Sequence, residues 1–148
     1  MPAISSERPS WNAQRENPGL ASVFEDAIDP IVSARLYTMV DERHRICPEV
    51  FLVPTPGHTP GHVSVQIESA SERALITGDF IHHPCQMANP EWREFADADP
   101  AQGIMTRTAA LTGCADQPVL VVGTHFPAPA GGLVVRDGAA FRFVPKQP

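Results

Sequence analysis

The stretch Thr55-Pro-Gly-His58-Thr-Pro-Gly-His62 decides how this sequence folds. Each Pro-Gly pair favours a turn, because proline fixes its own φ and glycine accepts backbone angles that other residues avoid. The stretch therefore predicts a rigid loop, so its two histidines are not the helical pair of a zinc protease. A functional role for the imidazoles is favoured in such a loop, and the alternative is a tight turn with incidental histidines.

Short apolar segments on both sides of this loop predict strands. Val63, Val65 and Ile67 alternate with polar residues, which is typical of a strand with one buried face. The continuous apolar run 118–123 predicts a strand buried on both faces. The expected strands are a short one at 45–46, then 49–54, 62–68, 73–77, 118–123, 132–136 and 139–144, with turns at 69–72 and at Asp137-Gly138.

Two helices are expected outside these strands. Apolar residues recur at steps of three and four from Leu20 to Met39, and Pro30 should kink or divide that helix. A second helix is expected over 99–112, with Asp99 as its N-cap and Gly113 closing it. The polar residues 1–18 predict a loosely ordered segment, which leaves 19–148 as one domain.

The overall composition excludes several classes of protein. The 148 residues suffice for one core, and 17 acidic against 11 basic side chains give a net charge of −6, which disfavours nucleic-acid binding. No stretch approaches about 18 apolar residues, so neither a membrane span nor a signal peptide is expected. Cys47, Cys85 and Cys114 form no CxxC pair and are expected to be buried or half-buried, which favours a reducing cytoplasm.

Further polar residues follow two of the predicted strands. Thr77-Gly78-Asp79 ends one strand in a carboxylate, with His82 and His83 close behind it, and Val122-Gly123-Thr124-His125 ends another in an imidazole. Alone, the aspartate could cap a turn and each histidine could be structural. Together, His58, Asp79 and His125 offer the nitrogen and oxygen donors that suit zinc, iron or manganese.

These three motifs, in this order and at about this spacing, resemble those of the metallo-β-lactamase-fold hydrolases. The resemblance runs from about Gly19 to Val144, and the stretches 78–86 and 124–129 look most like the branch of lactonases and organophosphate hydrolases. It implies an α/β fold, the C-terminal half of the αββα metallo-β-lactamase sandwich, with one mixed β-sheet and flanking helices.

The resemblance also implies a hydrolase site for a small-molecule ester, lactone or similar bond. In the family two metal ions, usually zinc, share a bridging hydroxide that attacks the bond. Carried over, His58 holds one metal, Asp79 bridges both and His125 holds the other, while His62 orients the loop. The residues implied for the pocket wall are Phe80, His82, His83 and Phe126.

The sequence departs from the family pattern in one motif. The family's other metal ligands come from HxHxDH, which this sequence lacks, and His44 is its only histidine before His58. Each metal would keep two ligands where a catalytic zinc normally has three, so weak metal binding and incomplete catalysis are expected.

Two alternatives to an active hydrolase stay open on the sequence. One is a non-catalytic truncated fragment or a half-domain that acts through a partner chain, with self-association through the unpaired sheet face. The other is a small acidic ligand-binding domain without a metal, in which the loop around His58 only shapes a turn.

Overall fold

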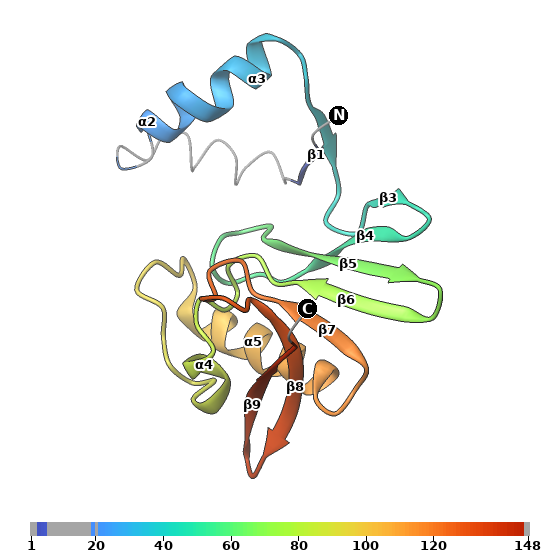
Figure 1. Ribbon diagram of the computed structural model, residues 1–148. Coiled ribbons are helices and arrows are strands. Elements are labelled where there is room, and N and C mark those ends of the chain that lie inside the picture. The colour runs from blue at the N-terminus through green and yellow to red at the C-terminus, as the bar shows by residue number, and fades with distance from the viewer. Residues whose placement is uncertain (1–2, 6–18, 20, 147–148) are drawn as a thin grey trace.

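The computed structural model describes residues 3–5, 19 and 21–146 of the chain (Figure 1). In chain order its elements are β1 (Ala3–Ser5), α2 (Ala21–Val23), the π-helix η2 (Phe24–Ile28), α3 (Asp29–Ser33), β2 (Thr38–Val40), β3 (Arg45–Cys47), β4 (Val50–Pro54), β5 (Val63–Ser69), β6 (Glu72–Ile76), α4 (Cys85–Ala88), α5 (Pro100–Cys114), β7 (Val119–Val122), β8 (Gly131–Asp137) and β9 (Ala140–Pro145).

A seven-stranded sheet in the order β3-β4-β5-β6-β7-β8-β9 organises the molecule. Only the pair β6 and β7 is parallel, so the sheet is mixed, as expected from the sequence. Each expected strand is present to within one residue at either end. Ala70 and Ser71 make the β5–β6 turn with positive φ angles, and Gly138 does so between β8 and β9. The short parallel pair β1 and β2 was not expected.

The hydrophobic core lies between one face of this sheet and the helices α4 and α5 (Figure 1). Leu75 of β6, Val121 of β7 and Val134 of β8 point into it and meet Met87 of α4 and Leu111 of α5. Along β7, Val119 and Val121 are buried whereas Leu120 and Val122 are half-buried. The expectation that β7 is buried on both faces is therefore wrong, because in the described part of the chain helices pack on one side of it.

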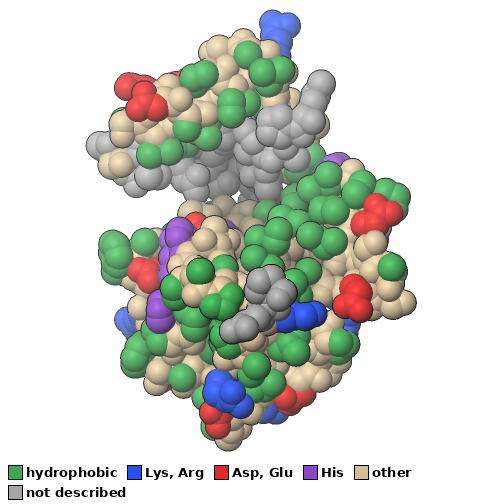
Figure 2. All heavy atoms as spheres, in the orientation of Figure 1, with side chains coloured by type: hydrophobic (Ala, Val, Ile, Leu, Met, Phe, Trp, Pro, Cys, Tyr) green, Lys and Arg blue, Asp and Glu red, His purple; other side chains and the backbone are tan. Residues whose placement is uncertain are grey.

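The opposite face of the sheet is also apolar. Paired residues of neighbouring strands point to the same side, so Val65, Ile76 and Val122 share this face. Figure 2 shows hydrophobic side chains gathered over β4 and β5. The members of the face are half-buried except for the buried Leu52; they are Val50, Leu52, Val63, Val65, Ile67, Ala74, Ile76, Leu120, Val122, Leu133, Val135 and Val144.

The N-terminal helical region is shorter than its sequence pattern predicts. The α2, η2 and α3 segments end at Ser33, because Arg35 takes a left-handed φ of 54° that an α-helix cannot contain. Leu36 and Met39 therefore lie outside the helix, with exposed side chains. Pro30 is the second residue of α3, which follows the π-helix η2 directly, so the helix changes type next to the residue expected to kink or divide it.

The second helix begins as expected and ends later. The Asp99 side chain accepts a hydrogen bond from the Gln102 backbone N–H at 3.0 Å and caps α5. Gly113 does not close the helix, which continues to Cys114 with Ala115 as its C-cap. The side chain at Cys114 packs into the core, and this packing favours two more helical residues than the glycine predicts.

Other expectations concern cysteines, the N-terminus and membranes. All three cysteines are free, and Cys114 and Cys47 are buried and half-buried as expected, but Cys85 is exposed. Burial raises the pKa of the Cys114 thiol. Most of the segment 1–18 lies outside the described residues, although Ala3–Ser5 forms β1. In the described ranges no helix has the length and apolarity needed to cross a bilayer.

The loop between β4 and β5 lies directly against α5 through two glycines. A Cβ at Gly57, where φ is +133°, would come within 2.4 Å of the Gly103 backbone. We expect Gly57→Ala to lower the free energy of unfolding by at least about 1–3 kcal/mol, because of the strained φ and the backbone overlap. Gly113→Ala is the matched control, since a Cβ there meets nothing within 4 Å and α5 should gain up to about 1 kcal/mol. Urea unfolding measures both; equal stability of the two variants would contradict this packing.

Candidate metal centre

The candidate site residues come together at one edge of the sheet. The parallel strands β6 and β7 end side by side there, and they deliver Asp79 and His125 from the loops that follow them. The β4–β5 loop reaches the same edge, because Pro54 pairs with Val63 and β5 runs antiparallel to β6. Residues 46 apart in the sequence therefore become neighbours.

The Asp79 carboxylate lies between two imidazoles. Its Oδ1 is 2.9 Å from His125 Nε2, and its Oδ2 is 3.7 Å from His58 Nε2. The two carboxylate oxygens thus face different histidines. The structure brings together the His58, Asp79 and His125 set inferred from the sequence, and their imidazole nitrogens and carboxylate oxygens are the donor types that zinc accepts.

A second aspartate, Asp97, lies behind His58. Its Oδ1 is 3.1 Å from His58 Nδ1, and its side chain is 1% exposed. An Nδ1–H that donates to this carboxylate leaves Nε2 of His58 as the nitrogen that faces Asp79. Asp97 therefore fixes both the tautomer and the orientation of the imidazole.

The charge of Asp97 is balanced by a buried arginine of α5. Arg107 Nη2 lies 3.9 Å from Asp97 Oδ2, and the arginine side chain is fully buried. Arg107 also donates from Nε to the Phe80 carbonyl at 2.9 Å and from Nη1 to the carbonyls of Pro90 and Trp92. Burial lowers the pKa of Arg107, and the neighbouring Asp97 opposes that shift. One side chain thus connects the core, the 80–92 segment and the aspartate behind His58.

His62 holds the loop that carries Asp79. Its Nδ1 is 2.9 Å from the Thr55 carbonyl oxygen, and its Nε2 accepts the Asp79 backbone N–H at 2.9 Å, which assigns the proton to Nδ1. Burial lowers the pKa of His62, while its bond to the Thr55 carbonyl opposes the shift. A Cβ at Gly78 would lie 2.8 Å from His62 Nε2, so glycine allows this contact. His62 thus contacts the backbone of Asp79 and not its carboxylate.

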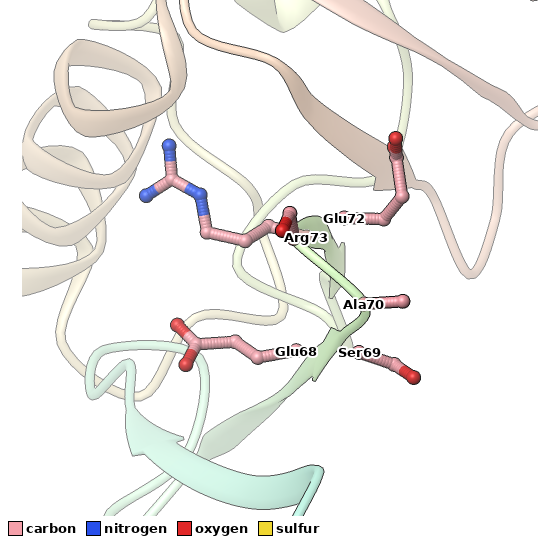
Figure 3. Close-up of a pocket in the computed structure, with 6 residues that line it drawn as sticks. Glu68, Ser69, Ala70, Glu72 and Arg73 are labelled. Carbon is pink, nitrogen blue, oxygen red and sulfur yellow. The ribbon is translucent and has the colours of Figure 1, made fainter.

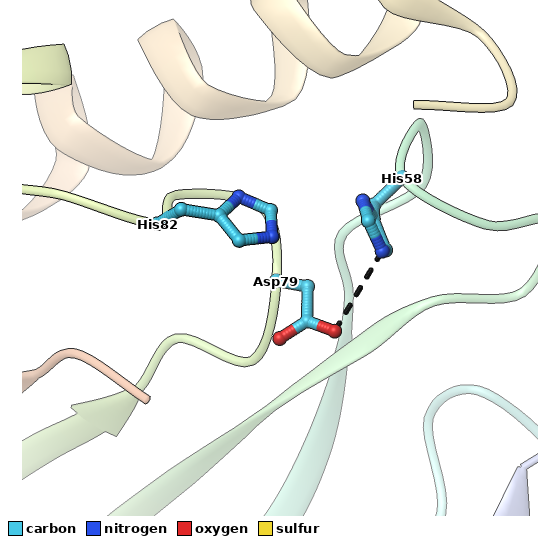
Figure 4. A group of neighbouring side chains, drawn as sticks. All are labelled: His58, Asp79 and His82. Atoms are coloured by element: carbon cyan, nitrogen blue, oxygen red, sulfur yellow. Dashed lines mark ion pairs between the residues drawn. The ribbon is translucent and has the colours of Figure 1, made fainter. Parts of the chain in front are cut away.

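His82 is the further imidazole of the cluster (Figure 4). Its ring centroid lies 5.1 Å from that of His58 and 4.9 Å from that of His125, and the His125 ring is stacked on it at 18°. Ligand atoms of His58, Asp79 and His82 all lie within 4.8 Å of one another. Burial lowers the pKa of His82, and the carboxylate of Glu94, 3.8 Å from Nδ1, opposes the shift.

The other residues implied for the pocket wall lie elsewhere. Phe80 and Phe126 are 2% and 7% exposed and pack in the hydrophobic core, and their place in a pocket wall stays a prediction. Their apolar rings anchor the loops that carry Asp79 and His125 to the hydrophobic core. His83 is exposed, and its Nδ1 accepts the Cys85 backbone N–H at 3.1 Å. Of the four residues, His82 is the one in the metal-ligand cluster.

A separate pocket lies at the far end of β5 and β6 (Figure 3). It is lined by residues of the hairpin between these strands, Glu68, Ser69, Ala70, Ser71, Glu72 and Arg73. Because β5 begins at the metal-site edge and ends at this hairpin, the pocket is remote from Asp79. It therefore takes no part in the candidate centre.

Comparison with known proteins identifies the family. The model of the metallo-beta-lactamase superfamily matches residues 5–136, and the chain belongs to this superfamily. A search of the curated proteins found no match. The mixed sheet with flanking helices is accordingly a metallo-β-lactamase fold, and the family relationship agrees with the resemblance carried by the His58, Asp79 and His125 motifs.

Solved structures show the same fold at low sequence identity. A hydrolase of the beta-lactamase superfamily, AbOPH, has a TM-score of 0.80 at 23% identity over 88% of this chain and 45% of its own. AidC, a dizinc quorum-quenching lactonase, has a TM-score of 0.76 at 21% identity over 90% and 46%. A probable metal-dependent hydrolase from Staphylococcus aureus has a TM-score of 0.74 at 16% identity over 97% and 53%. The chain spans about half the length of each.

The buried pair of Arg107 and Asp97 gives the site its rigidity. Removing the guanidinium leaves a buried carboxylate uncompensated, so we expect Arg107→Met to lower the free energy of unfolding by about 3–5 kcal/mol. The control is Arg142→Met, because Arg142 and Asp137 are 3.7 Å apart but 61% and 66% exposed, and an exposed pair contributes less than about 1 kcal/mol. Urea denaturation followed by circular dichroism compares the two. Similar losses in both variants would refute the role given to the buried pair.

Proposed function

We propose that His58, Asp79 and His125 bind a divalent transition metal, zinc first, as part of a hydrolase centre for an ester, lactone or similar bond. The observation that carries this proposal is the position of the Asp79 carboxylate, with Oδ1 toward His125 and Oδ2 toward His58. A carboxylate placed in this way can bridge two sites or serve one ion between the imidazoles. Membership of a family of metal-dependent hydrolases supports the same conclusion.

The chain's own residues would prepare this centre in two ways. Asp97 holds Nδ1 of His58 and leaves its Nε2 for the metal. His62 fixes the backbone at Asp79, and its neutral form is favoured by burial. A bound divalent metal polarises a carbonyl group and makes water acidic enough to act as a nucleophile near neutral pH. The protein supplies orientation around that chemistry.

Further ligands are needed for full hydrolytic activity. If the chain holds two ions as the dizinc lactonase AidC does, His58 and Asp79 serve one and Asp79 and His125 the other, which leaves two ligands each. A catalytic zinc normally has three protein ligands and an open position. We therefore propose that the chain by itself is catalytically incomplete. With further ligands, the site would hydrolyse an ester, lactone or similar bond, a proposal supported by the lactonase among the structural neighbours.

Metal content tests the proposed centre directly. After loading with zinc and dialysis, we expect stoichiometric metal on the wild-type chain and only a trace on Asp79→Asn, because the amide removes the anionic donor between the histidines. Asp137→Asn is the matched control, since Asp137 is exposed on the β8–β9 hairpin. Inductively coupled plasma mass spectrometry gives the zinc per chain. Wild-type protein that retains only a trace, or Asp79→Asn that retains full zinc, would contradict the proposal.

A second candidate function is a half-domain that works by associating with another chain. The apolar sheet face that includes Val65, Ile76 and Val122 favours it, because in a sandwich of two sheets this is the surface that the other sheet covers. We propose that a second copy of this chain covers the apolar face, because both copies carry the same face and isologous pairing is the commonest form of association. The metal centre lies at the edge of this sheet and could be completed by such a partner.

Association through this face is open to a simple measurement. We expect the chain to form dimers or larger species in analytical ultracentrifugation, and Val65→Lys, which places a charge on the face, to reduce association by at least about tenfold in Kd. Thr108→Lys is the control, because Thr108 is exposed on α5, which packs against the other face of the sheet. Circular dichroism confirms that both variants fold. A wild-type chain that stays monomeric at all concentrations would refute this candidate.

A further inference from the structure

We propose that His82 is an additional metal ligand, so that His58, Asp79, His82 and His125 together bind one metal ion in a closed four-residue site. This inference rests on the proposed metal-binding function and specifies one metal ion per chain. It differs from the arrangement carried over from the family, in which the metal positions are shared among His58, Asp79 and His125 and His82 belongs to the pocket wall.

The orientation of the His82 ring supports the assignment. Its Nδ1 lies toward Glu94 Oε2, at 3.8 Å, and makes no hydrogen bond to any residue in the described part of the chain. Figure 4 shows the other ring nitrogen turned toward Asp79 and His58. The ligand atoms of these three residues lie within 4.8 Å of one another. His82 thus presents a nitrogen to the same space that His58 faces.

The backbone that carries His82 is held in place by α4. Gln86, which is 5% exposed, accepts the backbone N–H groups of His82 and His83 on its Oε1, at 2.7 and 3.2 Å. A buried glutamine therefore fixes the segment before α4. The position of the imidazole follows from this anchored backbone and not from a free loop.

The half-buried imidazoles of His58 and His82 share a further feature, a carboxylate on the side away from Asp79. Asp97 lies behind His58 Nδ1 at 3.1 Å, and Glu94 lies behind His82 Nδ1 at 3.8 Å. Metal-ligating histidines almost always donate their other N–H to a carboxylate, a carbonyl or water. Asp97 is within hydrogen-bonding distance of His58, and Glu94 is the carboxylate that His82 Nδ1 faces at 3.8 Å without a hydrogen bond. Glu94 and Asp97 come from the same segment between α4 and α5. This segment thus places one carboxylate beside each of the two imidazoles.

The number of donors decides between one ion and two. Three imidazole nitrogens and one carboxylate make four ligands, which fills a tetrahedral zinc site, whereas two ions would divide them and leave each underligated. Zinc with bonds of about 2.0–2.1 Å needs donors about 3.3–3.4 Å apart. Among His58, Asp79 and His82 the donors lie within 4.8 Å of one another, and His125 joins them through Asp79 at 2.9 Å. The His125 ring is stacked on His82 at 18°, so one of these two rings has to rotate before both nitrogens face the same ion.

A closed site has a chemical consequence. Structural zinc sites use four protein ligands, whereas catalytic sites keep one position open for water or substrate. Four ligands from this chain would therefore give tight binding of one ion and little hydrolysis.

Cobalt(II) titration of the full chain tests the inference, because the visible absorption of cobalt reports its coordination number. We expect one Co²⁺ per chain with the intense bands of tetrahedral cobalt. His82→Ala should lower the affinity at least about tenfold and weaken the bands, and Glu94→Gln should lower the affinity by about 10–100-fold, as loss of such partners does. His44→Ala is the control, because it removes a histidine outside the cluster and should leave affinity and spectrum unchanged.

The outcomes separate this inference from the proposed function. Wild-type spectra and affinity in His82→Ala, or two Co²⁺ ions per chain, would overturn the role of His82 while Asp79-dependent binding stands. A wild-type chain that binds no cobalt would overturn the metal centre itself. Circular dichroism and urea unfolding of each variant establish that it is folded before titration.

Discussion

The buried carboxylate of Asp97 is the contact on which the metal-site edge depends. It lies between the His58 imidazole and the Arg107 guanidinium, with 1% and 0% of the aspartate and arginine side chains exposed. The charge is offset by the Arg107 guanidinium at 3.9 Å and by one hydrogen bond, between Asp97 Oδ1 and His58 Nδ1. The same arginine donates to carbonyls of the segment that follows Asp79. Core and site are therefore stabilised by one network, and a change in either is expected to affect the other.

This network explains how several polar loops at one edge of the sheet keep fixed positions relative to one another. The β4–β5 loop lies on α5 through Gly57 and Gly103, and His62 links the same loop to the backbone of Asp79. The packing of Gly57 on Gly103 positions the loop that carries His58, and the His62 hydrogen bond positions the backbone of Asp79. The assembled donors can serve one metal ion or two. The position of the His82 ring favours one ion.

Much of the sheet, and the convergence of His58, Asp79 and His125, could be predicted from the sequence. Strand periodicity and Pro-Gly turns are local signals, and parallel strands that end in Asp79 and His125 place both at one edge. Arg35 shows where local patterns fail, because the apolar period continues to Met39 although the left-handed backbone at Arg35 ends the helix.

The contacts behind the ligands could not be predicted. Asp97 is 39 residues from His58 in the sequence, and nothing in its local pattern distinguishes it from a surface aspartate. The Arg107 side chain is fully buried in a helix whose sequence gives no sign of an internal charge. Phe80 and Phe126 adjoin the candidate ligands in the sequence, and no local signal shows that their rings pack into the hydrophobic core.

The most direct test of the account is a crystal structure of the zinc-loaded chain with anomalous diffraction at the zinc edge. We expect one anomalous peak per chain, within about 2.0–2.2 Å of nitrogens of His58, His82 and His125 and of an Asp79 oxygen. A peak elsewhere, two peaks bridged by Asp79 with His82 unbound, or loaded crystals without a peak at these residues would contradict it.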